Sequence, residues 1–372
     1  MRKQLGNSRA ENSRRVDKYW VPIVGRTLDL LACFESATES LTLEEIVRRT
    51  GIAHTTAFRI LHTLVVRDYL SQSGRSYRLS RVRKKLNLGF ANLSRQVSLA
   101  VEIQASLERA ADAAGVHLQV WDNDRNPDRA IQNAEEMARQ KLDLAVEFQL
   151  SEQAAPVISD IFLRAGIPLI SMVNPHHGTV YFGVNNFRAG VCAGMALADH
   201  AARAWKGKVD AILLLESPIA GRTTHSRTVG VIRGLEERRG PLPKEIVHHL
   251  DGGGERSKSR IATQAFLSKL KGRNRVLIVG INDESAVGAV SALENSPGSI
   301  DAAVIGHGGS PEILELIADR KSPCIGTVSF HAELYGPDLL NFAFPIVEGK
   351  SAPVYHYVAH ELIDKSSAGY AK

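Results

Sequence analysis

The stretch LTLEEIVRRTGIAHTTAFRILHTLVVRDYL, residues 41–70, decides the fold of the N-terminal part of the chain. Thr42 stands where a helix needs an N-cap, and two acidic residues follow it in the first turn, where the helix dipole favours anions. Gly51 supplies the backbone freedom for a tight turn after this helix. A further helix is predicted over His54–Arg67, because apolar residues recur there at helical spacing: Ala57, Ile60, Leu61 and Leu64.

The residues on either side complete a small domain. Upstream, Val24–Phe34 has the period of an amphipathic helix. Downstream, residues 69–79 predict a β-hairpin with its turn at 73–75. Two helices joined by a glycine turn form a helix-turn-helix, and a hairpin after the second helix is a wing. The first helix is expected to place four apolar side chains on one face: Val24, Leu28, Leu31 and Phe34.

Charge separates this domain from the rest of the chain. Residues 1–85 carry 17 Lys and Arg against 8 Asp and Glu, a net charge of +9, whereas the remainder carries 29 basic and 32 acidic residues, a net charge of −3. A basic head on a mildly acidic body favours a polyanionic partner for the head; the alternative is a solvated basic surface. Residues 1–20 are expected to be a flexible basic segment, and they lack the apolar run of a secretory signal.

The segments GRTLDLLACF (25–34), 41–70 and SGRSYRLS (73–80) together resemble the winged helix of IclR-type regulators. The resemblance implies an all-α winged helix-turn-helix with a small β-wing at 21–82, bound to double-stranded DNA. An operator made of two half-sites would then match a homodimer. The alternative is a winged helix used only for protein contacts. The residues expected to contact DNA are His54, Thr55, Thr56, Arg59 and His62 on the recognition helix and Arg75 at the tip of the wing.

Bulk composition limits the class of protein. The chain has 372 residues, 44% hydrophobic and 23% charged, which suits a globular protein of more than one domain. No apolar run reaches the roughly 18 residues that span a bilayer. The three cysteines, Cys33, Cys192 and Cys324, are far apart and odd in number. This spacing argues against a disulfide framework or a Cys-based zinc site and favours the cytoplasm.

Strand-like and helical segments alternate from residue 86 onward, which predicts parallel sheets covered on both faces, in two lobes. Strands are expected at 86–91, 117–121, 142–148, 167–172, 180–184, 209–215, 246–250, 275–280, 302–306 and 325–329. Helices are expected at 97–114, 127–140, 154–165, 188–204, 224–238, 257–271, 284–294, 311–319 and 331–348.

Six motifs in this region occur in the order and spacing of the type 1 periplasmic-binding-protein fold, as in ribose-binding proteins and LacI-type sensors. This resemblance implies a bilobed α/β ligand-binding domain at 86–360 that closes on a small molecule and is crossed by the chain three times. It places the N-lobe at 86–186 and 331–350 and the C-lobe at 187–330 and 351–372. The motifs are AGIPLI (165–170), VNNFRAG (184–190), SRTVGVIRGLEE (226–237), GINDESAVGAVSAL (280–293), VIGHGGSPEILELI (304–317) and GTVSFHAELYG (326–336).

By the same resemblance, the ligand lies among residues that follow the strands. Asp283 has an alternative role as a helix cap, and Arg227 has one as a partner across the hinge. Where the family carries two sugar-binding carboxylates, this chain has Val173 and His307, while several Arg stand nearby; this favours an anionic sugar acid or sugar phosphate. The expected ligand-binding residues are Asn92, Ser94, Arg95, Gln149, Asn174, Arg222, His225, Arg227, Asn282, Asp283, His307 and Phe330.

Other features indicate no separate chemistry. The histidine pairs at 176–177 and 248–249 lack neighbouring ligands at metal spacing, and the Gly-rich turn at 252–254 lacks the ending of a phosphate loop. No catalytic set can be assigned, so we expect neither an enzyme nor a cofactor. The sequence therefore predicts an allosteric transcriptional regulator; the alternative is a solute-binding protein of a transport system.

Overall fold

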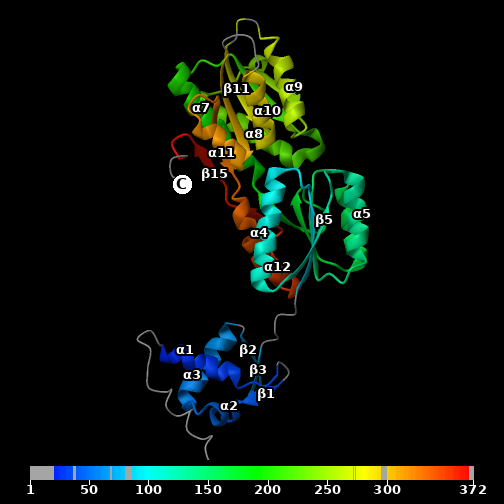
Figure 1. The fold of residues 1–372 in the computed structure, drawn as a ribbon, viewed down its shortest axis with the longest axis vertical. Helices are drawn as coiled ribbons and strands as arrows, with labels where there is room; N and C mark the ends of the chain where they lie inside the picture. Colours follow the sequence, from blue (N-terminus) through cyan, green and yellow to red (C-terminus); the bar gives the residue numbers. More distant parts are fainter. Residues whose placement is uncertain are drawn as a thin grey trace, which may run out of the picture. The chain divides into compact units, whose positions relative to one another are not determined.

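The structure is a computed structural model, and it describes residues 21–36, 39–67, 69–79, 86–270, 272, 274–294 and 300–367. It divides into two compact units, Met1–Lys85 and Leu86–Lys372 (Figure 1). The expected flexible segment 1–20 and the basic connector at 80–85 lie outside the described residues. In the part that is described, no helix combines the length and apolarity needed to cross a membrane.

The first unit is a three-helix domain with a small antiparallel sheet in the order β1-β3-β2. Thr42 and Glu45 form a capping box at the start of the second helix, and Gly51 ends that helix in the left-handed region at φ 68°. Strand β1 was not predicted, because three residues are too few to show a period. The elements are α1 (Pro22–Ala32), β1 (Ser40–Thr42), α2 (Leu43–Thr50), α3 (His54–Val66), β2 (Leu70–Ser73) and β3 (Ser76–Leu79).

The core of this unit confirms the predicted face of α3 and corrects that of α1. Ala57, Ile60, Leu61 and Leu64 are all buried, as expected. On α1, in contrast, Val24 and Leu28 are 52% and 60% exposed. Apolar residues occur on more than one side of α1, and spacing alone does not show which side packs. The buried side carries Gly25 and Leu30, and Phe34 packs just after the helix ends.

The second unit contains two six-stranded sheets, one in each lobe. The N-lobe sheet has the order β14-β8-β7-β6-β4-β5 and its pairs are parallel. The C-lobe sheet has the order β10-β9-β11-β12-β13-β15, with β15 antiparallel to β13. The ten expected strands are confirmed: β4 (Asn87–Asn92), β5 (His117–Asp122), β6 (Leu144–Gln149), β7 (Leu169–Val173), β8 (Val180–Val184), β9 (Ala211–Glu216), β10 (Val247–Asp251), β11 (Arg275–Gly280), β12 (Asp301–Gly308) and β13 (Cys324–Ser329).

Helices cover both faces of each sheet. In the N-lobe, α4 and α12 pack on one face and α5 and α6 on the other. In the C-lobe, α7 and α8 lie on one side and α9, α10 and α11 on the other. Their bounds are α4 (Ser98–Ala114), α5 (Pro127–Ala138), α6 (Ala155–Ala165), α7 (Asn186–Trp205), α8 (Gly221–Arg239), α9 (Arg256–Leu267), α10 (Asp283–Glu294), α11 (Pro311–Ala318) and α12 (Tyr335–Val347).

The chain passes between the two sheets three times, after β8, after β13 and after β14. The last crossing corrects the expected boundary, which assigned 351–372 to the C-lobe. Strand β14 (Tyr355–Val358) pairs with β8 and therefore belongs to the N-lobe sheet. Only β15 (Glu361–Asp364) joins the C-lobe sheet, and these two strands of four residues each are too short to assign from their pattern.

Helices α7 and α8 approach each other at four glycines. A Cβ atom on Gly190 would lie 1.9 Å from the carbonyl oxygen of Arg227, and one on Gly230 would lie 2.1 Å from that of Phe187. Gly194 and Gly234 make the equivalent approach one turn further along. No side chain fits at these positions, so glycine sets the separation of the helices and hence the position of Arg227.

Candidate functional site

A cavity of about 100 Å³ lies between the lobes of the second unit, and we call it the interlobe cavity. Six apolar side chains line it from the N-lobe: Leu93, Val97, Leu99, Phe148, Leu150 and Val173. The polar lining comes mostly from the C-lobe, namely Ser217, Thr224, Arg227, Asn282, Asp283, Glu284, His307 and Ser310.

Arg227 is buried at the centre of the polar side. Its Nε donates to Asn186 Oδ1 at 3.0 Å, and its guanidinium also donates to the carbonyl of Ile281. The Phe330 ring lies beneath it, 5.0 Å from Cζ. Burial lowers the pKa of Arg227 to about 10, so the group is still a cation at neutral pH. The described part of the chain pairs no carboxylate with this guanidinium.

Asn282 and Asp283 both line the interlobe cavity, but their side chains also have structural roles. Asn282 Oδ1 accepts from the backbone N–H of Ser285 at 3.0 Å, which caps α10. One oxygen of Asp283 accepts from the N–H groups of Gly309 and Ser310, and the other accepts from Thr327 Oγ1, each at 2.7 Å. Burial raises the pKa of Asp283. One oxygen of Asp283 therefore holds the segment after β12 in place, and the other bonds β13.

His307 lines the cavity as a neutral imidazole. Its Nδ1 lies 2.9 Å from the carbonyl of Gly280, and it can donate there because a carbonyl only accepts. Burial lowers the pKa of His307 to about 3. The ring therefore carries no charge at neutral pH.

Two hydroxyls on the C-lobe side were not predicted from the sequence. Ser217 Oγ and Thr224 Oγ1 are buried and have no hydrogen-bond partner, and both residues line the cavity. Ser217 follows β9 directly, and Thr224 lies one helical turn before Arg227 on α8. The sequence could have indicated Thr224, because residues three apart on a helix lie on the same face and Arg227 was already predicted.

Two predicted ligand-binding residues on α8 do not line the interlobe cavity, because they lie on the wrong face of the helix. Arg222 and His225 are exposed on α8, because they lie on the side opposite Thr224 and Arg227. His225 Nδ1 lies 3.2 Å from Glu216 Oε1, outside the interlobe cavity.

Five further predicted residues, all in the N-lobe, do not line this cavity. Asn92 Nδ2 donates to Gln104, Gln149 lies 3.0 Å from a ring nitrogen of buried His176, and Asn174 donates to the carbonyl of Leu150. Ser94 Oγ accepts from the N–H of Gln96 and borders a neighbouring surface cavity. The side chain of Arg95 is 69% exposed, 3.7 Å from Asp122.

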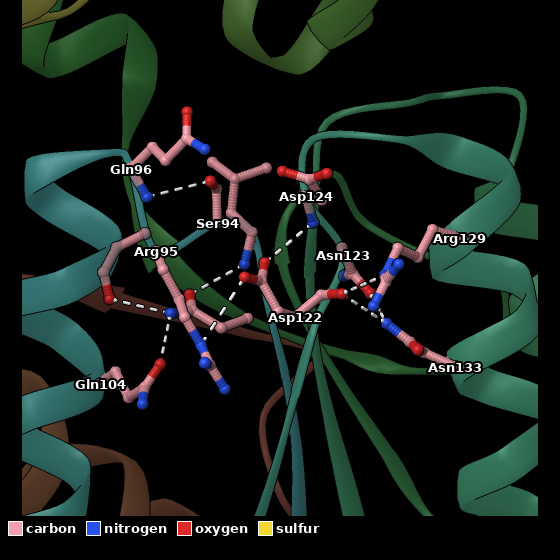
Figure 2. Close-up of polar contacts among 12 residues, drawn as sticks. Ser94, Arg95, Gln96, Gln104, Asp122, Asn123, Asp124, Arg129 and Asn133 are labelled. Atoms are coloured by element: carbon pink, nitrogen blue, oxygen red, sulfur yellow. Dashed lines mark hydrogen bonds and ion pairs between the residues drawn. The ribbon is translucent and has the colours of Figure 1, made fainter.

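Figure 2 shows the polar contacts that residues at the ends of β4 and β5 make with one another and with neighbouring helices. Asn123, Asn133 and Arg129 bond one another or the carbonyl of Asp122. Asn123 also donates to Glu147, which is fully buried in β6. Asn123, Asn133 and Arg129 thus have partners inside the N-lobe, although the second oxygen of Glu147 has none. The N-lobe side chains that reach the cavity are largely apolar.

The predicted DNA-contacting residues of the first unit are exposed or half-buried. His54, Thr55, Arg59 and His62 are exposed on α3, and Thr56 is half-buried. Arg75 is exposed in the turn between β2 and β3. Phe58, which was not predicted, is 48% exposed on α3, with its ring centroid 6.5 Å from that of His62. An exposed aromatic ring on this helix suits contact with a thymine methyl.

The two histidine pairs lie in different surroundings. Across the described ranges, no three His, Cys, Asp or Glu side chains gather so as to hold an ion. His176 is buried, and burial lowers its pKa to about 4, whereas His249 Nδ1 lies 3.2 Å from Glu216.

Two family models match the chain, one for each unit. The IclR helix-turn-helix domain matches residues 24–74, and the periplasmic binding protein domain matches residues 89–351. Among curated proteins, the chain is 34% identical over 96 residues to the "Pca regulon regulatory protein" of Pseudomonas putida. That match covers 26% of this chain, which spans about a third of the relative's length.

Solved structures resemble the second unit. A Mycobacterium smegmatis protein in complex with β-D-fucofuranose has a TM-score of 0.66 at 22% identity, covering 77% of this chain and 93% of that one. A periplasmic solute-binding protein of an ABC transporter from Actinobacillus succinogenes, with bound D-allose, has a TM-score of 0.66 at 19% identity, covering 77% and 99%. At these identities the likeness shows the bilobed fold.

Proposed function

The chain belongs to the periplasmic binding protein domain family, and on that premise we propose that it is a ligand-responsive transcriptional regulator. Its first unit would bind double-stranded DNA, and its second would bind a small molecule between the lobes. The observation that carries this proposal is the presence of an IclR helix-turn-helix domain in the same chain as the two-lobed domain. A solute-binding protein of a transporter has no use for such a head.

The first unit supports DNA binding through exposure and charge. The α3 side chains that reach solvent include Arg59, whose paired donors suit a guanine edge, and two threonines whose methyls suit thymine. Arg75 in the wing would contact a phosphate. The net charge of +9 over residues 1–85 favours a polyanion. The matched segment of the Pseudomonas putida relative, which is named as a regulator, agrees with this role.

Regulation requires the ligand to favour one arrangement of the lobes over another, and DNA binding to depend on that arrangement. We propose a homodimer that reads two half-sites about one helical turn apart or at multiples of it. A protein that reads the genome in this way works in the cytoplasm.

The effector is a small molecule that fits the interlobe cavity. Two structural neighbours hold β-D-fucofuranose and D-allose, so sugars and sugar-derived molecules are the first class to test. The matched families are regulator and binding domains, which supports a role without catalysis.

Selection of genomic fragments by the purified full-length chain, followed by fluorescence anisotropy on the enriched duplex, tests the proposal. The variant carrying both Arg59→Ala and Arg75→Ala should weaken binding at least tenfold and reduce the slope of log K against log salt by about 0.9 for each phosphate that is no longer neutralised. Arg139→Ala, on an exposed Arg in the second unit, is the matched control. A folded wild-type chain that enriches no duplex at low salt would overturn the proposal.

A further inference from the structure

The two walls of the interlobe cavity differ in kind. The N-lobe contributes six apolar side chains and only two polar residues, Ser98 and Arg125. Both polar residues already have partners across the cleft: Ser98 Oγ donates to Glu284 Oε1 at 3.0 Å, and Arg125 donates to the carbonyl of Gly253 at 2.9 Å. A ligand therefore meets hydrocarbon on its N-lobe side.

The C-lobe wall carries donors that lack acceptors. Ser217 and Thr224 are 8% and 6% exposed, and their hydroxyls have no partner. Arg227 donates three of its five N–H groups to Asn186 and Ile281, which leaves two for a ligand. Two hydroxyls and a guanidinium in one wall suit an oxygen-rich end of a small molecule.

Charge decides which kind of oxygen fits. Arg227 is a buried cation whose hydrogen-bond partners are both neutral, and a buried charge is costly unless an opposite charge meets it. Burial lowers its pKa and the attraction of the Asp283 carboxylate acts in the opposite direction, but that carboxylate forms no ion pair with the guanidinium among the described residues. The two acids of the wall are already occupied, Asp283 by Thr327 and two backbone N–H groups, and Glu284 by Ser98 and Arg256. An anionic oxygen would compensate the cation. A sugar hydroxyl would find no unoccupied carboxylate among these lining residues, although it could donate to the unpartnered Nε2 of His307.

Backbone strain marks the apolar wall as a site. Val173 lies at φ 68°, in the left-handed region that β-branched residues avoid. Asn or Gly would adopt this conformation at lower cost. Strained residues of this sort cluster where a ligand is held, and here the strain presents a valine side chain to the cavity.

Accepting the proposed function, we infer that the effector is a compact carboxylate with an apolar body. Its carboxylate contacts Arg227, Ser217 and Thr224, and its body lies against the N-lobe side chains. The cavity of about 100 Å³ limits the effector to a small molecule, since it is smaller than the engineered apolar cavity of about 150 Å³ that binds benzene in another protein. Two sources share this chemistry, an aromatic or alicyclic acid and a deoxygenated sugar acid.

Calorimetric titration of the full-length chain compares probes at millimolar concentration. Benzoate and cyclohexanecarboxylate represent the first source, and a 3-deoxyhexonate represents the second. Benzamide lacks the charge, glucuronate lacks the apolar body and glucose lacks both. At least one of the first three probes should bind tenfold or more tightly than each of the last three. Tighter binding of glucose or glucuronate, or no heat from any of the first three, would overturn the inference.

Matched variants locate the contacts. Thr224→Val keeps the side-chain shape and should weaken binding of the tightest carboxylate probe about tenfold. Thr223→Val, one residue along α8 and outside the cavity, is the control and should leave that affinity unchanged. Val97→Thr adds a hydroxyl to the apolar wall and should weaken binding of the same probe severalfold. Unchanged affinity in both Thr224→Val and Val97→Thr would contradict the assignment.

DNA is absent from these titrations, so the two proposals fail separately. A chain that binds the carboxylate but no duplex retains the ligand assignment and loses the regulatory role. A chain whose DNA affinity responds only to a neutral sugar keeps the regulatory role and loses the ligand assignment.

Discussion

The two lobes share a parallel-sheet architecture, yet they differ in the polar side chains that they bring to the interlobe cavity. Both lobes contain buried polar atoms without partners, but in the N-lobe these belong to Glu147, Gln149 and His176, which do not line the cavity. In the N-lobe, polar side chains at the strand ends bond one another, as Asn123 does with Glu147 and Asn133. In the C-lobe, Ser217 and Thr224 stay without partners beside Arg227. The difference teaches that position after a strand is insufficient to identify a ligand contact, because a residue must also have hydrogen-bonding capacity left over.

The largest expected effect concerns the support of the C-lobe wall. Gly230→Leu would force α8 away from α7, since even a Cβ would lie 2.1 Å from the Phe187 carbonyl oxygen. We expect a loss of about 3 kcal/mol or more in the free energy of unfolding, measured by urea denaturation. Val229→Leu, at the adjacent position that is 48% exposed, should be nearly neutral. Equal effects of the two variants would show that the glycine contact does not position this wall.

A second test uses pH, to which the buried acid of the N-lobe should respond. Burial raises the pKa of Glu147 from 4.5 to about 8, with Asn123 acting in the opposite direction. Between these values the folded protein keeps a proton that the unfolded chain releases. The free energy of unfolding is therefore highest, as far as Glu147 is concerned, below pH 4.5. It falls as pH rises toward 8, by up to about 1.4 kcal/mol per pH unit.

Glu147→Gln should flatten that dependence in thermal melts, because the amide does not titrate. Glu135→Gln, on a half-exposed acid of α5, should leave it in place. In the C-lobe, His307 should give a pH dependence of the opposite sign. Burial lowers the pKa of His307 to about 3, so its contribution to the free energy of unfolding is lost as pH falls below about 6.5. A Glu147→Gln protein that keeps the wild-type slope between pH 5 and 8 would show that Glu147 is ionised when folded.

A third test compares a satisfied polar group with an unsatisfied one. Asn123→Ala removes an amide that bonds Glu147, Phe148 and Asn133, and should cost about 2 kcal/mol of unfolding free energy. Thr224→Val removes a hydroxyl with no partner and should leave stability unchanged or raise it by up to about 1 kcal/mol. Equal destabilisation by both substitutions would contradict this distinction between a satisfied and an unsatisfied polar group.

Features of this molecule that depend on residues close together in the sequence could be predicted, whereas those that depend on residues far apart in the sequence could not. Periodicity, the Thr42 cap and the Gly51 turn are local, so the helices and ten strands of the two units could be predicted. Arg227, Asn282, Asp283, His307 and Phe330 were placed at the cavity because they follow strands or a family motif. Which N-lobe residues are satisfied internally depends on neighbours far along the chain, such as Asn123 on Glu147, and no local pattern reveals that. Of the two unpredicted hydroxyls, that of Thr224 depended on the phase of α8, whereas Ser217 directly follows β9.

The smallest expected effect is at Val173, where the apolar wall carries backbone strain. Val173→Asn suits φ 68° better, so it should raise the free energy of unfolding by about 1 kcal/mol, whereas Val180→Asn, at a partly buried valine without positive φ, should lower it. The same Val173→Asn protein should bind the apolar carboxylate less tightly. A gain in stability with a loss of affinity would show that the strain is retained for the ligand. A loss of stability instead would mean that the valine side chain packs well enough to outweigh its backbone conformation, and the N-lobe wall would then be ordinary core.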